Sequence, residues 1–349
     1  MKAPSTWIDN LKLISTTAII ILHVAADGVV AEFNKNGNHT WWIAHFYDSL
    51  CRFGTPAFIM ITGCLLLRQS IGMRDFLKRR LNRILLPFVF WFSVYLAFHF
   101  ALKVRDEGLE SQAAHFFPWF FEQLLQGSEV HLWYVYMIIG VYMFIPIIKP
   151  WAQTASKAGL IYFLVIWLFT LLINQQRVVE WKTPFDLSYF SGYIGYVVLG
   201  YFIAEKITIT QRMRYLAVPV FLTGFLITLY GTYFLTASDG TFSDIFYNRL
   251  SINVLLMAVS AFIFIKGMGE QKTENTFATV RTTVGKYGFG IYLNHVIILI
   301  VLSHFGINYK LINPWVGIPL TAIICLFLSC LVINILNRMP LGKHVSGSL

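Results

Sequence analysis

The stretch that decides the fold is Trp7-Ile-Asp-Asn-Leu-Lys-Leu-Ile-Ser-Thr-Thr-Ala-Ile-Ile-Ile-Leu-His-Val24. It contains one cation near its start, Lys12, and one imidazole, His23, with ten uncharged residues between them. In an α-helix these two side chains share a face and lie about 16 Å apart along the axis. An ionisable group inside a membrane helix is costly, so it usually faces protein or a water-filled cavity. We therefore expect a functional polar interior here; a polar contact that locks the helix into a bundle is the alternative.

The rest of the chain has the composition of a polytopic membrane protein. Of its 349 residues, 57% are hydrophobic and only 13% are charged, which excludes an ordinary soluble protein. Stretches long enough to cross a hydrocarbon core of about 30 Å recur along the whole chain. The sequence predicts an all-α fold of about ten transmembrane helices in one domain, residues 1–349. The spans are expected near 11–31, 43–67, 84–103, 132–148, 158–174, 188–204, 215–236, 248–266, 288–306 and 314–336.

The net charge of +10 reflects membrane topology rather than nucleic-acid binding. With these spans, the loops on the side of the two termini hold 19 of the 27 Lys and Arg residues. The positive-inside bias therefore places both termini in the cytoplasm. The four cysteines show no metal-ligand spacing, so the sequence indicates neither a disulfide framework nor a metal site.

A basic cluster, Arg79, Arg80 and Arg83, lies where the loop 68–83 enters the third span. Arg80 and Arg83 are three residues apart, so they occupy one side of a helix. Planar guanidinium groups suit bidentate phosphate binding. We favour a phosphate site, with an ordinary lipid-binding anchor on the cytoplasmic side as the alternative.

Two further spans contain polar pairs. Asp48 and Arg52, four residues apart, can neutralise each other in the bilayer; a structural ion pair is the favoured interpretation, and a place beside His23 is the alternative. Tyr292 and His295 are deep in the ninth span and three residues apart, which favours a shared polar cavity. Gly288 and Gly290 in the same span predict close helix approach.

The expected outer side is rich in aromatic residues. Loop 104–131 contains the aromatic run 116–125, which predicts a short helix in the outer interface. That helix would serve as an anchor, or else as a lid over an acceptor site. The fourth span opens with His131-Leu-Trp-Tyr134 at the outer boundary, where Trp133 and Tyr134 fit an interfacial belt.

Taken in this order, the motifs resemble the acyltransferase-3 family of polytopic membrane acyltransferases. The matching elements are the lead-in Ile8-Asp-Asn-Leu-Lys12, the Lys12 to His23 spacing, Phe58-Ile-Met-Ile-Thr-Gly63, Arg80-x-x-Arg83, His131-Leu-Trp-Tyr134 and Phe289-Gly-Ile-Tyr-x-x-His295. Thr62 replaces the usual Ser, and Lys12 replaces the commoner Arg, which keeps the charge but weakens bidentate phosphate binding. Within the family the chain is similar to stand-alone O-acetyltransferases of bacterial surface glycans, of the enterobacterial common-antigen type.

The resemblance implies a multi-pass enzyme of the bacterial inner membrane. It would move an acetyl group from cytosolic acetyl-CoA to a hydroxyl of a surface glycan or glycolipid, in contact with membrane lipid and without metal or nucleic acid. His23 would act as general base, or else as an acyl-histidine relay; Tyr292 or His295 would donate to the oxyanion. The remaining expected site residues are Lys12, Arg79, Arg80 and Arg83 for the donor, and His131, Trp133, Tyr134, Asp48 and Arg52 for the acceptor.

Two other classes of protein remain open at this point. A transporter or flippase of a lipid-linked glycan would also need buried charges among its helices. A membrane scaffold is weaker, because it would not need Lys12 and His23 on one face. Thioester consumption by the purified protein separates the enzyme from the transporter.

Overall fold

The computed structural model describes residues 5–33, 38–126, 129–174, 192–239, 241–270 and 276–348, and within these ranges its regular elements are all helices. The elements are α1 (Thr6–Glu32), α2 (His39–Cys51), α3 (Gly54–Leu66), α4 (Met73–Glu107), α5 (Leu109–Gln126), η1 (Val130–Leu132), α6 (Trp133–Thr154), α7 (Lys157–Asn174), α8 (Ile194–Lys206), α9 (Gln211–Asp239), η3 (Ile245–Tyr247), α10 (Ile252–Gly267), α11 (Thr276–His304), α12 (Pro314–Arg338) and α13 (Gly342–Val345).

The predicted fold class, a polytopic all-helical membrane protein, is confirmed. In the described ranges, eight helical segments are long and apolar enough to cross a membrane. The fifth and sixth predicted spans correspond to the shorter helices α7 and α8, of 18 and 13 residues. The first residues of the sixth predicted span, before 192, lie outside the described part of the chain.

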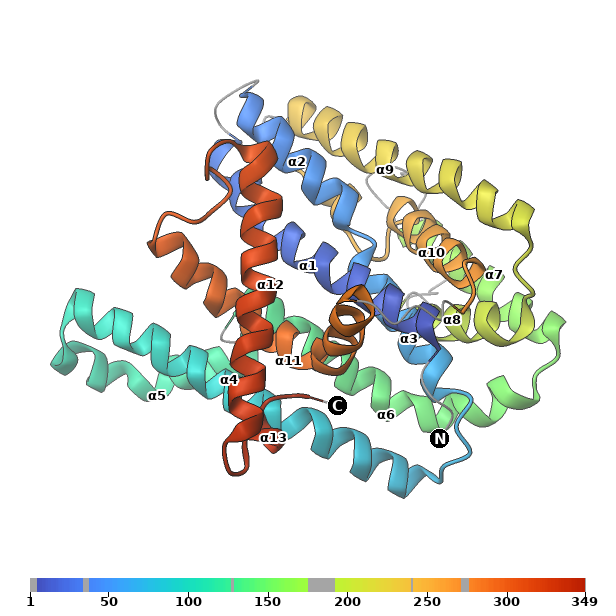
Figure 1. Ribbon diagram of the computed structural model, residues 1–349, viewed down its shortest axis with the longest axis horizontal. Helices are drawn as coiled ribbons and strands as arrows, with labels where there is room; N and C mark the ends of the chain where they lie inside the picture. Colours follow the sequence, from blue (N-terminus) through green and yellow to red (C-terminus); the bar gives the residue numbers. More distant parts are fainter. Residues whose placement is uncertain are drawn as a thin grey trace.

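Helix α1 runs through the middle of the bundle and packs against α2, α3, α10, α11 and α12 (Figure 1). Trp7, Ile8 and Leu11 at its start are buried in the main apolar core. The first predicted span is therefore the centre of the fold. Both chain ends lie in the lower part of Figure 1.

The second predicted span, 43–67, corresponds to the candidate membrane span His39–Leu66, which is not one continuous helix. It is divided into α2 and α3, which end and begin on either side of Arg52 and Phe53. Pro56 explains the break, because its ring would collide with the carbonyl group of Arg52 in a continuous helix. The break places the side chain of Arg52 at the end of α2, beside the bundle interior.

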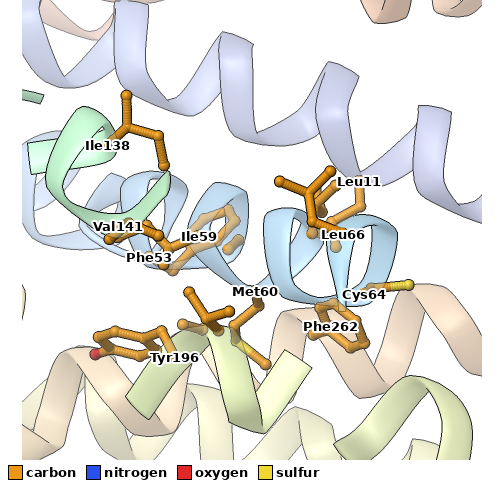
Figure 2. Close-up of a cluster of buried hydrophobic side chains, with 14 of the residues drawn as sticks. Leu11, Phe53, Ile59, Met60, Cys64, Leu66, Ile138, Val141, Tyr196 and Phe262 are labelled. Carbon is orange, nitrogen blue, oxygen red and sulfur yellow. The ribbon is translucent and has the colours of Figure 1, made fainter. Parts of the chain in front are cut away.

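Helices α3 and α8 cross at unusually close range. A Cβ atom added at Gly63 would overlap the carbonyl oxygen of Val197, and one added at Gly200 would overlap that of Met60. Small residues permit such backbone contact between membrane helices. Figure 2 shows the core around this crossing: Leu66 of α3 lies beside Leu11 of α1, and Met60 of α3 points toward α8, the helix that carries Tyr196.

Loop 104–131 is largely helical. Helix α5 covers the predicted aromatic segment and runs back along α4, forming a hairpin that projects to the left in Figure 1. Phe100 and Lys103 of α4 contact Trp119 of α5, with ring centroids of Phe100 and Trp119 5.8 Å apart. The hairpin returns the chain to the bundle interior, so that α6 starts there, with Leu132 and Val135 fully buried.

Candidate active site

Three histidines from distant parts of the sequence meet inside the bundle. His23 comes from α1, His131 from η1 and His295 from α11. The ring centroids of His23 and His295 are 5.0 Å apart, those of His131 and His295 5.1 Å, and those of His23 and His131 6.3 Å. His131 and His295 are buried, and His23 is partly buried. The structure thus brings His131, expected at the outer boundary, into one cluster with His23.

Hydrogen bonds fix the proton on the His295 ring. Its Nδ1 lies 2.7 Å from the carbonyl oxygen of Tyr292 and 3.2 Å from that of Ile291. A carbonyl oxygen only accepts, so Nδ1 carries the hydrogen in the neutral ring and Nε2 keeps its lone pair. Nε2 is buried and has no hydrogen-bond partner among the described residues. This nitrogen is therefore a free acceptor within the cluster.

The hydroxyl of Tyr292 donates to the backbone carbonyl of His131 and so joins α11 to η1, which directly precedes α6. The ring of Tyr292 also contacts the rings of His131 and Tyr134, with centroids 5.5 and 5.1 Å apart. An oxyanion contact by Tyr292 would require its hydroxyl to leave this carbonyl, and His295 has no N–H free for that purpose. The expected oxyanion roles thus stay predictions that need a rearrangement.

A cavity of about 190 Å³ opens between α1, α3, α4, α6 and α11. Three cations lie on it, Lys12, Arg80 and Arg83. Most of the rest of the wall is apolar or aromatic, and its members are Ile19, Thr55, Phe58, Ile61, Thr62, Leu65, Leu66, Ile84, Tyr134, Ile138, Tyr142, Gly285, Gly288, Phe289, Tyr292 and Gly347. The cations and Tyr292 therefore border one continuous space.

A second, smaller cavity of about 20 Å³ lies beside this space and borders one of the three histidines, His295. It shares Ile19, Phe58, Gly288 and Tyr292 with the larger cavity, and its wall also includes His295. Lys12, Ile19 and His23 lie on one face of α1, because seven and four residues are close to whole helical turns. The face of α1 that Lys12 and His23 share therefore runs beside both cavities.

Four expected donor-binding cations divide into two groups. Arg80 and Arg83 line the cavity, whereas Arg79 is exposed and is not part of its wall. Arg80 is held by a 3.4 Å hydrogen bond to Gln69. Lys12 is paired with Asp9, its Nζ 3.3 Å from a carboxylate oxygen. Helical periodicity alone does not separate Arg79 from the pair, because Arg79 and Arg83 are four residues apart and also neighbours on a helix; the cavity wall in the structure does.

Gly288 and Gly290 differ in role. A Cβ at Gly290 would overlap the carbonyl oxygen of Ser346, so close packing is confirmed there. At Gly288 the prediction is wrong: no heavy atom lies within 4 Å of an added Cβ, and the residue borders both cavities. The missing side chain at Gly288 enlarges the cavity rather than joining two helices.

Two of the expected acceptor residues lie in a second polar region. Asp48 and Arg52 make the predicted ion pair, and the Arg52 guanidinium lies 3.6 Å from the centroid of the Tyr247 ring. His45 Nε2 donates to the carbonyl of Leu229 at 2.8 Å, so its Nδ1 accepts from the Tyr247 hydroxyl. These bonds connect α2 to α9 and η3 and favour a structural task for the ion pair.

Trp133 and Tyr134 point to different places. The Arg249 guanidinium lies 4.1 Å from the centroid of the Trp133 ring, a cation–π contact. Tyr134, in contrast, borders the cavity that holds Arg80 and Arg83. The two neighbours in the His-Leu-Trp-Tyr motif therefore do not form one aromatic belt.

Sequence reasoning missed Tyr95 of α4, which is fully buried. Its ring centroid is 5.3 Å from that of His131, and its hydroxyl bonds to α11 beside His295. A signal was present: Trp91, Tyr95 and His99 repeat every four residues in an otherwise apolar span. Such spacing marks one helix face. His99 in turn pairs with Glu129, two residues before His131, at 2.7 Å.

Comparisons with known proteins agree with this arrangement. Over 108 residues, 30% of this chain, the sequence is 27% identical to the succinoglycan biosynthesis protein ExoH of Rhizobium meliloti (strain 1021). That alignment spans 29% of the length of ExoH. No solved structure matches the chain.

Residues 5–334 match the family described as an acyltransferase domain, which includes all three histidines and the cations of the cavity. This match favours an enzyme over a transporter of lipid-linked glycans. The chain is a multi-pass membrane acyltransferase and belongs to the acyltransferase-3 family.

Proposed function

We propose that the protein is an O-acetyltransferase of the bacterial inner membrane, with cytoplasmic termini, that modifies a surface polysaccharide or its glycolipid precursor. One observation carries the proposal: the cavity bordered by Lys12, Arg80 and Arg83 shares four wall residues with the small cavity that reaches His295, and we take the two together as the path of the donor to the histidine cluster. Acetyl-CoA combines a polyanionic nucleotide with a long uncharged arm that ends in the thioester. A path that is cationic at one end and mostly apolar along its length suits this donor.

The donor would bind with its phosphates at the cations. Arg80 and Arg83 lie near the start of α4, on the predicted cytoplasmic side, and phosphate–guanidinium contacts are charge-assisted. Lys12 supplies a point charge rather than a fork. The apolar wall between Ile19 and Phe58 would hold the uncharged arm and bring the thioester carbon toward His23.

His23 is the proposed base. We propose that His295 Nε2, which has no other hydrogen-bond partner among the described residues, accepts the N–H of one His23 nitrogen and so leaves the other His23 nitrogen as a proton acceptor. His23 would remove the proton of the acceptor hydroxyl while the hydroxyl oxygen attacks the thioester carbon. Collapse of the tetrahedral intermediate breaks the C–S bond, and the leaving thiolate takes the proton from His23. The products are an ester and free CoA.

The acceptor would approach from the other side of the cluster, beside His131 and Trp133. The family supports an acyl group as the group transferred. The similarity to ExoH, a succinoglycan biosynthesis protein, supports a polysaccharide acceptor. Within that class we propose an acceptor of the enterobacterial common-antigen type, in line with the motif resemblance.

The test is a transfer assay with purified protein, labelled acetyl-CoA and extracted bacterial glycolipids. Wild-type protein should consume thioester and label the glycan, and His23→Ala should abolish both while its expression and unfolding temperature stay near wild type. His304→Ala is the matched control, because His304 is exposed at the end of α11. Turnover by His23→Ala at more than a small fraction of the wild-type rate rules out His23 as base or relay.

A further inference from the structure

The hydroxyl of Tyr95 lies within the hydrogen-bond ladder of α11. It donates to the carbonyl oxygen of Leu293 at 3.0 Å and accepts the backbone N–H of Ile297 at 3.1 Å. Leu293 and Ile297 are four residues apart, so these two backbone groups are the pair that an uninterrupted α-helix would bond to each other. A side chain from α4 thus bridges one rung of another helix.

The bridge needs a hydroxyl. Within an apolar bundle, a backbone N–H and C=O depend on partners from the protein itself. A hydroxyl both donates and accepts, so Tyr95 satisfies the two groups at once. Insertion of a side chain into the ladder is a recognised cause of local helix deformation. The bridge therefore fixes the local geometry and the rotation of α11 at this turn.

His295 lies midway between the two bridged residues. The same turn of α11 carries other outside contacts: the Cys325 thiol of α12 donates to the carbonyl of His295 at 3.4 Å. The Tyr95 ring also packs on the ring of His131. The fully buried side chain of Tyr95 thus contacts the backbone on both sides of His295 and the ring of His131.

We propose that Tyr95 is a positioning residue that sets His295, and with it His131, in the geometry that the reaction requires. For its catalytic consequence this inference rests on the proposed function. Tyr95 is not part of the wall of either cavity. Its effect should therefore be on turnover rather than on donor binding.

The test compares Tyr95→Phe with wild type. The substitution removes only the hydroxyl, and misplacement of a reacting group by about 1 Å costs up to roughly a hundredfold in rate. We expect kcat to fall about tenfold or more while the KM for acetyl-CoA stays within about twofold. Tyr196→Phe is the matched control: Tyr196 is also fully buried, and its hydroxyl donates to the Arg249 carbonyl at 2.7 Å, away from α11.

A double-mutant cycle separates positioning from general destabilisation. If Tyr95 acts through His295, the loss caused by Tyr95→Phe should disappear in a His295→Ala background, where residual transfer is followed with radiolabelled acetyl-CoA. An unchanged kcat in the single variant, a raised KM alone, or an equal loss in both backgrounds would overturn the proposal.

A structural readout keeps this inference distinct from the proposed function. Amide hydrogen exchange over residues 289–300 should increase in Tyr95→Phe and stay at the wild-type level in Tyr196→Phe, whether or not the protein acetylates any glycan. Unchanged exchange would show that the bridge does not support α11. If exchange increases in Tyr95→Phe but wild-type protein transfers no acetyl group, the structural role of the Tyr95 bridge is supported and the proposed acetyltransferase function is refuted.

Discussion

Filling the cavity at Gly288 tests the donor path most directly. Gly288 borders both cavities, and an added Cβ would meet no heavy atom within 4 Å. Gly288→Leu should therefore fold well, and the helix should gain up to about 1 kcal/mol because leucine is a better helix former than glycine. With donor bound, however, the leucine would overpack the path. Overpacking costs about 1–3 kcal/mol, which corresponds to a roughly 5- to 150-fold weaker affinity for acetyl-CoA.

The assay is acetyl-CoA binding by isothermal calorimetry, together with unfolding temperature. Gly140→Leu is the matched control, because Gly140 lies in α6, is exposed and also has no heavy atom within 4 Å of an added Cβ. Both variants should be at least as stable as wild type, but only Gly288→Leu should lose donor affinity, with Gly288→Ala intermediate. Wild-type affinity in Gly288→Leu would refute the assignment of this cavity to the donor.

Three other predictions follow from the same geometry. Arg80→Ala and Arg83→Ala should each weaken acetyl-CoA binding by about 1.5–3 kcal/mol, about one to two decades, whereas Arg79→Ala should bind normally; equal losses in all three would favour a nonspecific surface charge. Gly63→Ala should lower stability by about 1–3 kcal/mol, seen as a lower unfolding temperature, because its methyl group collides with the α8 backbone; an unchanged unfolding temperature would contradict the crossing. In sealed, oriented vesicles, acetyl-CoA on the cytoplasmic face should support acetylation of a glycan on the opposite face; transfer only from the outer face would reverse the predicted orientation.

Much of the architecture could be predicted from the sequence because hydrophobic length is a local property. The break between α2 and α3 was harder to predict, because a proline within a span, such as Pro56, can kink a helix without ending it. The periodicity of Lys12 and His23 likewise predicted a shared face. What it did not predict was which other helices that face would meet.

The candidate site itself depends on contacts between distant residues. His131 precedes a predicted span, so its position in the sequence indicated the membrane boundary. In the structure the α4–α5 hairpin returns the chain to the bundle interior, and His99 pairs with Glu129 just before His131. Tyr95 was not predicted for a related reason. A single tyrosine in an apolar span does not indicate a role until the structure places its hydroxyl beside Leu293. Long-range packing decides both cases.

The distance between the cations and the histidines constrains the reaction. Lys12 and His23 are about 16 Å apart along α1, and charged groups are costly within the hydrocarbon core. The phosphates of a donor must therefore stay at the cationic end, while an uncharged part spans the distance to His23. Among the described residues, the cavity wall contains Ile19, Phe58 and Ile138 and no aspartate or glutamate. A thioester on a long neutral arm meets this requirement, and a small charged donor such as a free acyl phosphate does not, because it would bring its charge to the histidines. The separation of charge from chemistry along α1 thus favours acyl-CoA over other activated acyl donors.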